Sequence, residues 1–166
     1  MNLQKLTEKA EKSNFYLFIL NRILGNVIPF NRPHKYRIKD ISKSNIKVKL
    51  PYRRSNFNHI KGIHACALAT LCEFASGLLL LINLDPKKYR LIMKRIEIDF
   101  LYQAKKDVFV EYHFLQSEFE KIKTDLKSGP LEIVPELIVK DSEGNEICKA
   151  KVYWHIKSWS DVKTKL

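Results

Sequence analysis

The sequence has little glycine, proline or cysteine, and each shortage excludes a class of protein. Five Gly and six Pro in 166 residues are too few for a collagen-like or low-complexity chain. The three Cys, at positions 66, 72 and 148, form no CxxC pair and no even set. We therefore expect neither a disulfide framework nor a metal site. Apolar residues make up 45% of the chain, which is enough for one packed domain.

Targeting signals are also missing from the ends of the sequence. Residues 1–12 are charged and polar, without the basic-then-apolar layout of a signal peptide, and neither end carries a lipidation pattern. Together with the cysteine usage, this predicts a cytoplasmic protein in a reducing compartment.

Positive charge is abundant and unevenly distributed. The formal net charge is +12, and residues 34–61 hold nine Lys or Arg against one acid, whereas residues 97–146 hold twelve acids against six bases. One interpretation is a lysine-rich solvated surface, and another is a polyanionic ligand such as a nucleotide-bearing molecule. Nucleic acid is not expected as a partner, because the chain carries no zinc-finger spacing, RNP-like motif or basic heptad region.

No repeat or linker divides the chain, so we expect a single domain over residues 1–166. It comprises a helical extension over 1–30 and a core over 34–158. Spacing of apolar residues predicts a helix from Leu3 to Leu24 that Gly25 ends. Its aromatic stretch, 15–20, would pack against the domain or a partner subunit, or lie on a membrane surface.

Alternation of apolar and polar residues predicts an antiparallel sheet in the rest of the chain. The predicted strands cover residues 44–50, 95–100, 108–114, 131–140 and 147–157, the last two joined by a hairpin turn over 141–145. A helix is expected over Ser117–Lys127, with Ser128-Gly129-Pro130 ending it.

The segment from Ile63 to Asn83 is apolar on all sides and carries one formally charged residue, Glu73. A membrane span needs roughly 20 apolar residues, and a central acid disfavours it, so no transmembrane segment is expected. The pattern instead predicts an α+β domain in which a long central helix is wrapped by the sheet. Cys66 and Cys72 are expected in its core.

A carboxylate in a buried helix is costly unless it is paired, protonated or used, so Glu73 is the main functional candidate. Its structural alternative is a hydrogen-bonded acid or one at a subunit seam. Upstream, a helix beginning at about His64 would offer free N–H groups to an oxyanion, and the Asn58 amide would add a donor. His64 itself fits a capping role better than a catalytic one.

The run Asn58-x5-His64-x8-Glu73 resembles the hotdog-fold acyl-CoA thioesterases of the phenylacetyl-CoA and 4-hydroxybenzoyl-CoA type. Further segments, over 21–30, 48–54, 96–101 and 139–147, look like an uncharacterised branch of this superfamily. The resemblance implies a homodimer or tetramer with thioesters bound at the subunit interface and no cofactor beyond the coenzyme A of the substrate. It also implies roles for four residues: Glu73 as nucleophile or general base, and His64, the N–H of Ala65 and Asn58 at the oxyanion site. Lys or Arg side chains would meet the CoA phosphates, and Arg53, Arg54 and Lys61 are the candidates because they lie nearest to the site in the sequence.

The sequence departs from the family pattern at two positions. Ala65 replaces the family's Gly after the His, which places a methyl group near the thioester, and Gly77 stands where related enzymes often carry a hydroxyl. Acyl-CoA hydrolysis is therefore the predicted activity, and a hotdog module that binds acyl-CoA or acyl chains without turnover is the alternative.

Overall fold

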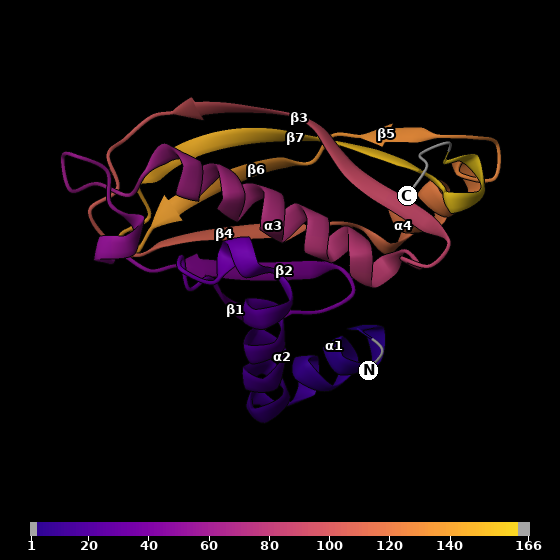
Figure 1. Ribbon diagram of the computed structural model, residues 1–166, viewed down its shortest axis with the longest axis horizontal. Coiled ribbons are helices and arrows are strands. Elements are labelled where there is room, and N and C mark those ends of the chain that lie inside the picture. Colours follow the sequence, from indigo (N-terminus) through magenta and orange to yellow (C-terminus); the bar gives the residue numbers. More distant parts are fainter. Residues whose placement is uncertain (1–2, 163–166) are drawn as a thin grey trace.

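The computed structural model describes residues 3–162 and consists of one long helix wrapped by an antiparallel sheet (Figure 1). Its helices are α1 (Leu3–Lys12), α2 (Asn14–Val27), α3 (Ala65–Asn83) and α4 (Gln116–Asp125). Its strands are β1 (Arg37–Ile41), β2 (Asn45–Leu50), β3 (Tyr89–Phe100), β4 (Val108–His113), β5 (Leu131–Ile133), β6 (Glu136–Asp141) and β7 (Glu146–Ser158). The expected α+β class is confirmed.

The sheet has the strand order β1-β2-β4-β6-β7-β3, and β5 pairs with the distal part of β7. Every pairing is antiparallel, and the hairpin between β6 and β7 forms where the sequence predicts it. At its tip Gly144 has a φ of 90°, and the Asp141 carboxylate accepts hydrogen bonds from the N–H groups of Glu143 and Asn145. Strands β1 and β3 end this order, and the short β5 is also an edge strand, because it pairs with β7 alone among the described strands.

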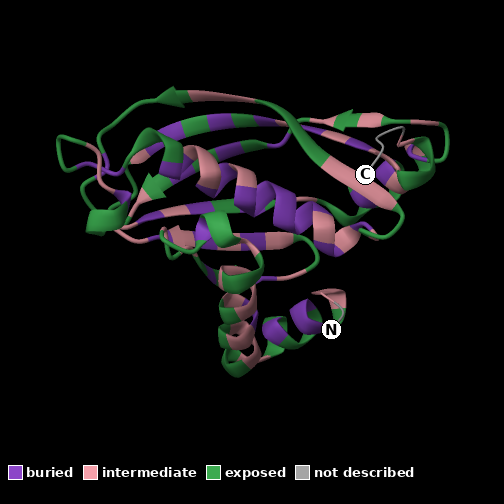
Figure 2. Cartoon of the chain, in the orientation of Figure 1, coloured by how far each residue is buried: buried purple, intermediate pink, exposed green. Residues whose placement is uncertain are grey.

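Helix α3 lies along the inner face of the sheet, and its middle and C-terminal parts are buried (Figures 1 and 2). The strands supply alternate residues to the same core, as the period of two predicts. In β7 these are Cys148, Ala150, Val152, Trp154 and Ile156. By length and apolar composition α3 is the one described helix that would suffice to cross a membrane, and 67% of its most apolar window is buried inside the domain. We assign it as the core helix.

The predicted helix over Leu3–Leu24 is two helices in the structure. The chain breaks at Ser13, whose extended backbone (φ −152°, ψ 122°) allows α1 to turn and bury Leu6 and Ala10. Gly25 does not end α2, which continues to Val27. The residue before a proline is disfavoured in helical conformation, and Pro29 accordingly stops the helix at Ile28.

Two further expectations were wrong, and one strand was not predicted. The strand predicted over 131–140 is divided between β5 and β6 around Pro135, which has no N–H to donate to a ladder. Strand β1 escaped prediction because a bulge between Ile38 and Asp40 breaks the period of two. Cys66 is exposed, since it lies in the first turn of α3 before the sheet covers the helix, whereas Cys72 is buried as expected.

Candidate active site

The segment that leads into α3 is held by the buried side chain of Asn56. Its Nδ2 donates to the carbonyl oxygens of His34 (3.0 Å) and Pro51 (2.9 Å), and its Oδ1 lies 3.0 Å from His34 Nδ1. The backbone carbonyl of Asn56 accepts from the N–H of His64 at 2.7 Å. One amide therefore fixes the start of α3 against two other loops.

Asn58 shapes the turn that precedes the helix. Its Oδ1 accepts from the N–H groups of Gly62 (2.9 Å) and Ile60 (3.1 Å), and Lys61 in that turn takes a φ of 59°. In the described part of the chain, the Asn58 Nδ2 donates to no acceptor. The orientation that closes the turn thus leaves the amide N–H₂ available to a ligand.

His64 is the N-cap of α3, as the sequence favours. Its Nδ1 accepts from the N–H of Cys66 at 3.1 Å. Ala65 begins the helix on the surface, and its N–H has no partner among the residues that the structure describes. Asn58, His64 and Ala65 therefore gather at the positive end of the helix dipole, where free N–H groups stabilise negative charge.

Glu73 lies half-buried about two turns further along α3, and its carboxylate has no hydrogen bond or salt bridge within residues 3–162, although its backbone carbonyl accepts from the Ser76 hydroxyl at 3.3 Å. Burial raises the pKa of its carboxyl above the ordinary value of 4.5. Eight residues of helix place it about 12 Å along the axis from Ala65. The structure therefore separates Glu73 from the oxyanion candidates within one chain.

Two aromatic residues that the sequence did not single out lie beside this acid. The Tyr36 hydroxyl donates to the carbonyl of Ala67 at 2.9 Å, and its ring stacks on Phe74 with 5.8 Å between centroids. Burial raises the pKa of Tyr36, and the neighbouring Glu73 carboxylate raises it further. Tyr36 lies outside any periodic segment, so no signal in the sequence pointed to it.

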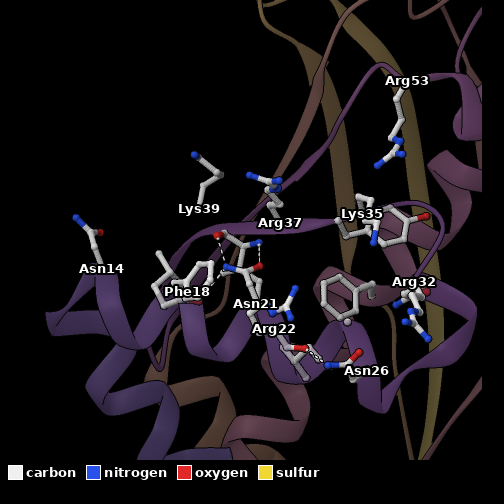
Figure 3. Close-up of a pocket in the computed structure, with 17 residues that line it drawn as sticks. Asn14, Phe18, Asn21, Arg22, Asn26, Arg32, Lys35, Arg37, Lys39 and Arg53 are labelled. Atoms are coloured by element: carbon white, nitrogen blue, oxygen red, sulfur yellow. Dashed lines mark hydrogen bonds between the residues drawn. The ribbon is translucent and has the colours of Figure 1, made fainter.

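The three expected CoA contacts do not lie together. Arg53 lines a groove of about 600 Å³ between α2 and β1, and Phe74 of α3 lines it too. Figure 3 shows Arg53 on the side of this groove opposite α2, with Arg37 and Lys39 of β1 between them. Arg54 and Lys61 are exposed outside the groove, and the Lys61 carbonyl accepts from the Tyr52 hydroxyl at 2.7 Å.

Gly77 owes its identity to packing against β7. A Cβ at this position would lie 2.7 Å from Cζ2 of the Trp154 ring, which occupies the space that a side chain would need. The indole Nε1 donates to the Ser76 hydroxyl at 3.0 Å, and that hydroxyl donates in turn to the carbonyl of Cys72 at 2.9 Å. The Ser76 hydroxyl is therefore buried and already hydrogen-bonded on both sides.

Several solved structures with the same architecture are described as thioesterases or as probable or putative ones. A protein of unknown function from Pseudomonas aeruginosa, described as a probable thioesterase, is 26% identical, with a TM-score of 0.78 over 85% of this chain and 95% of its own. A thioesterase from Haemophilus influenzae is 12% identical, with a TM-score of 0.68 over 89% and 94% of the two chains. A thioesterase variant from Pseudomonas aeruginosa is 12% identical, with a TM-score of 0.68 over 86% of this chain and 94% of its own. The hotdog fold expected from the sequence is confirmed.

Sequence comparison places the chain within one family. The profile of DUF4442, described as a domain of unknown function, matches residues 18–156. No curated protein matches the chain.

Proposed function

The chain belongs to the DUF4442 family, and on that premise we propose that it hydrolyses acyl-CoA thioesters with Glu73 as nucleophile or general base. The observation that carries the proposal is a half-buried carboxylate with a raised pKa and no partner in the described residues, on the core helix of a thioesterase-like fold. A carboxyl group whose pKa is raised toward neutrality is a more effective base than an ordinary one.

The proposed site needs two copies of the chain. Ala65 and Glu73 are about 12 Å apart along α3, too far to act on one thioester group. Strand β3 supports pairing of two copies, because its outer edge has no partner strand within residues 3–162 and large apolar side chains are exposed in and after it. These are Ile92, Met93, Phe100, Leu101 and Tyr102. In the proposed dimer, Glu73 of one copy faces the helix start of the other.

The reaction adds water across the acyl carbon–sulfur bond. As a base, Glu73 takes a proton from water, the water oxygen bonds to the acyl carbon, and the departing CoA thiolate receives the proton. As a nucleophile, the carboxylate attacks the acyl carbon and expels the CoA thiolate, which leaves an anhydride. Water then cleaves the anhydride, which releases the acid, regenerates the Glu73 carboxylate and supplies a proton to the thiolate. In both routes the Ala65 N–H and the Asn58 amide stabilise the oxyanion.

Free thiols at all three cysteines agree with the proposed cytoplasmic location.

Release of free thiol from short, medium, long and aromatic acyl-CoAs tests the proposal. Glu73→Gln is expected to lower kcat by about a hundredfold or more with the dimer intact. Glu11→Gln is the matched control, because Glu11 is exposed on α1 and its replacement removes the same charge. Unchanged turnover in Glu73→Gln refutes the assignment.

The second candidate is a module that binds acyl-CoA without turnover. Gly77 favours it, because position 77, four residues after Glu73, offers no hydroxyl, and the neighbouring Ser76 hydroxyl is already hydrogen-bonded to Cys72 and Trp154. This candidate predicts acyl-CoA binding that Glu73→Gln hardly changes, and no thiol release from any substrate.

A further inference from the structure

The groove between α2 and β1 is a preformed hollow on the outer side of the sheet's edge. Asn21 joins its two walls: Nδ2 donates to the carbonyl of Ile38 at 3.0 Å, and Oδ1 accepts from the Ile38 N–H at 2.7 Å (Figure 3). The Asn21 side chain thus bonds to both backbone groups of Ile38, as the backbone of a neighbouring strand would. A groove fixed in this way loses little conformational entropy when a ligand binds.

The residues that line this groove carry six positive charges and no negative charge. These cations are Arg22, Arg32, Lys35, Arg37, Lys39 and Arg53. Within residues 3–162 none of them takes part in a salt bridge, although many lysines elsewhere on the surface do, including Lys47 and Lys94. Six cations without acids between them repel one another, which disfavours the cluster unless an anion binds.

The lining of the groove reaches the neighbours of the proposed catalytic acid. It includes Phe74, the residue after Glu73, and Tyr36, whose ring stacks on Phe74 and whose pKa is raised by burial and by the Glu73 carboxylate. A ligand that spans the groove therefore has its anionic part among the cations and its other end directed toward α3. Four of the six cations are arginines, whose planar guanidinium groups bind phosphate oxygens in pairs.

We propose that this groove binds the phosphate groups of the CoA portion of the substrate, an inference that rests on the proposed function and assigns the site to α2 and β1. Sequence position alone suggested Arg53, Arg54 and Lys61 for this role. In this assignment Arg53 still binds the phosphates, together with the other five cations of the groove.

An anionic lipid surface is the competing source of phosphate. Exposed apolar residues lie on and after α2, namely Phe15, Phe18, Val27 and Phe30. The hollow shape of the groove and its aromatic lining favour a single extended ligand over a flat headgroup layer. Binding to mixed phosphatidylcholine and phosphatidylserine vesicles, with no binding of CoA, would overturn the proposal.

Calorimetric titration with CoA and with adenosine 3′,5′-bisphosphate tests the site directly. The triple variant Arg22→Gln, Arg37→Gln and Lys39→Gln changes exposed side chains and is expected to weaken binding of both ligands by about tenfold or more. The matched control, Lys87→Gln, Lys88→Gln and Lys127→Gln, removes the same charge from another unpaired cluster. Equal weakening in both variants would refute a specific site.

Kinetics then separate this inference from the proposed function. With acyl-CoA, the groove variant is expected to raise KM about tenfold or more with kcat nearly unchanged. With the matching acyl-pantetheine, which lacks the nucleotide phosphates, the wild-type chain and the variant should behave alike. Unchanged KM for acyl-CoA beside normal turnover overturns the groove assignment alone, whereas CoA binding without any turnover overturns the hydrolase proposal alone.

Discussion

Gly77→Ala measures how tightly α3 packs on β7. The new Cβ would lie 2.7 Å from Cζ2 and 2.8 Å from Cη2 of Trp154, closer than real Cβ contacts. The indole has little freedom to retreat, because Trp154 is 4% exposed and its Nε1 donates to the Ser76 hydroxyl. Relief of the contact therefore requires movement of α3 or loss of that hydrogen bond.

Two opposing effects set the size of the change. Overpacking of a core costs about 1–3 kcal/mol, while replacing glycine by alanine within a helix gains about 1 kcal/mol. The expected net loss in the free energy of unfolding is about 1 kcal/mol. Gly25→Ala in α2 is the control: a Cβ there meets nothing within 4 Å, so the variant should gain about 0.5–1 kcal/mol.

Urea unfolding followed by circular dichroism, at one protein concentration, compares the two variants. We expect Gly77→Ala to lower the free energy of unfolding and Gly25→Ala to raise it. Both substitutions change helix propensity alike, but only position 77 faces a packed side chain. Trp154→Phe removes the atoms nearest position 77, so Gly77→Ala should cost less in that background. Equal stabilisation by both alanines would refute the packing argument and reopen a functional reason for Gly77.

The remaining predictions concern the acid, the loop amide and the helix cap. Because burial raises the pKa of Glu73 above its ordinary value of 4.5, the unfolded chain loses the proton first, and the fold loses stability as the pH rises from that value through the raised pKa. Glu73→Gln should therefore raise the free energy of unfolding at about pH 8 and leave it unchanged at about pH 3; an equal effect at both values contradicts this. Asn56→Ala leaves two carbonyl groups without donors and should cost about 2–3 kcal/mol, seen as a lower Tm. His64→Ala removes the cap of α3 and should cost about 1 kcal/mol, which His64→Asn should largely restore.

Periodicity identified most elements because each buries one face. Strand β7 alternates between core and surface as predicted, and α3 is apolar throughout because the sheet wraps around most of it. Prediction failed where local geometry interrupts the pattern. The bulge in β1, the break at Ser13 and the division at Pro135 each change the direction of the chain without a change in composition.

The candidate site was only partly predictable, for a similar reason. Glu73 stands out as the lone charge in an apolar segment, and His64 is recognisable as a cap before a helix. Asn58 had a donor role expected, yet its carbonyl oxygen also closes the turn before α3. Asn56 and Tyr36 drew no notice, because their importance lies in contacts with residues more than twenty positions away.

The sequence by itself determined the class of fold, the central helix and the one acid within it, since these follow from where apolar and charged residues recur. It also determined the excess of positive charge in residues 34–61. Only the tertiary structure decided which of those charges act together, because Arg22 and Arg32 join them only when α2 folds against β1. It likewise decided that Glu73 and Ala65 stay apart in one chain, since a rigid helix fixes the distance between them.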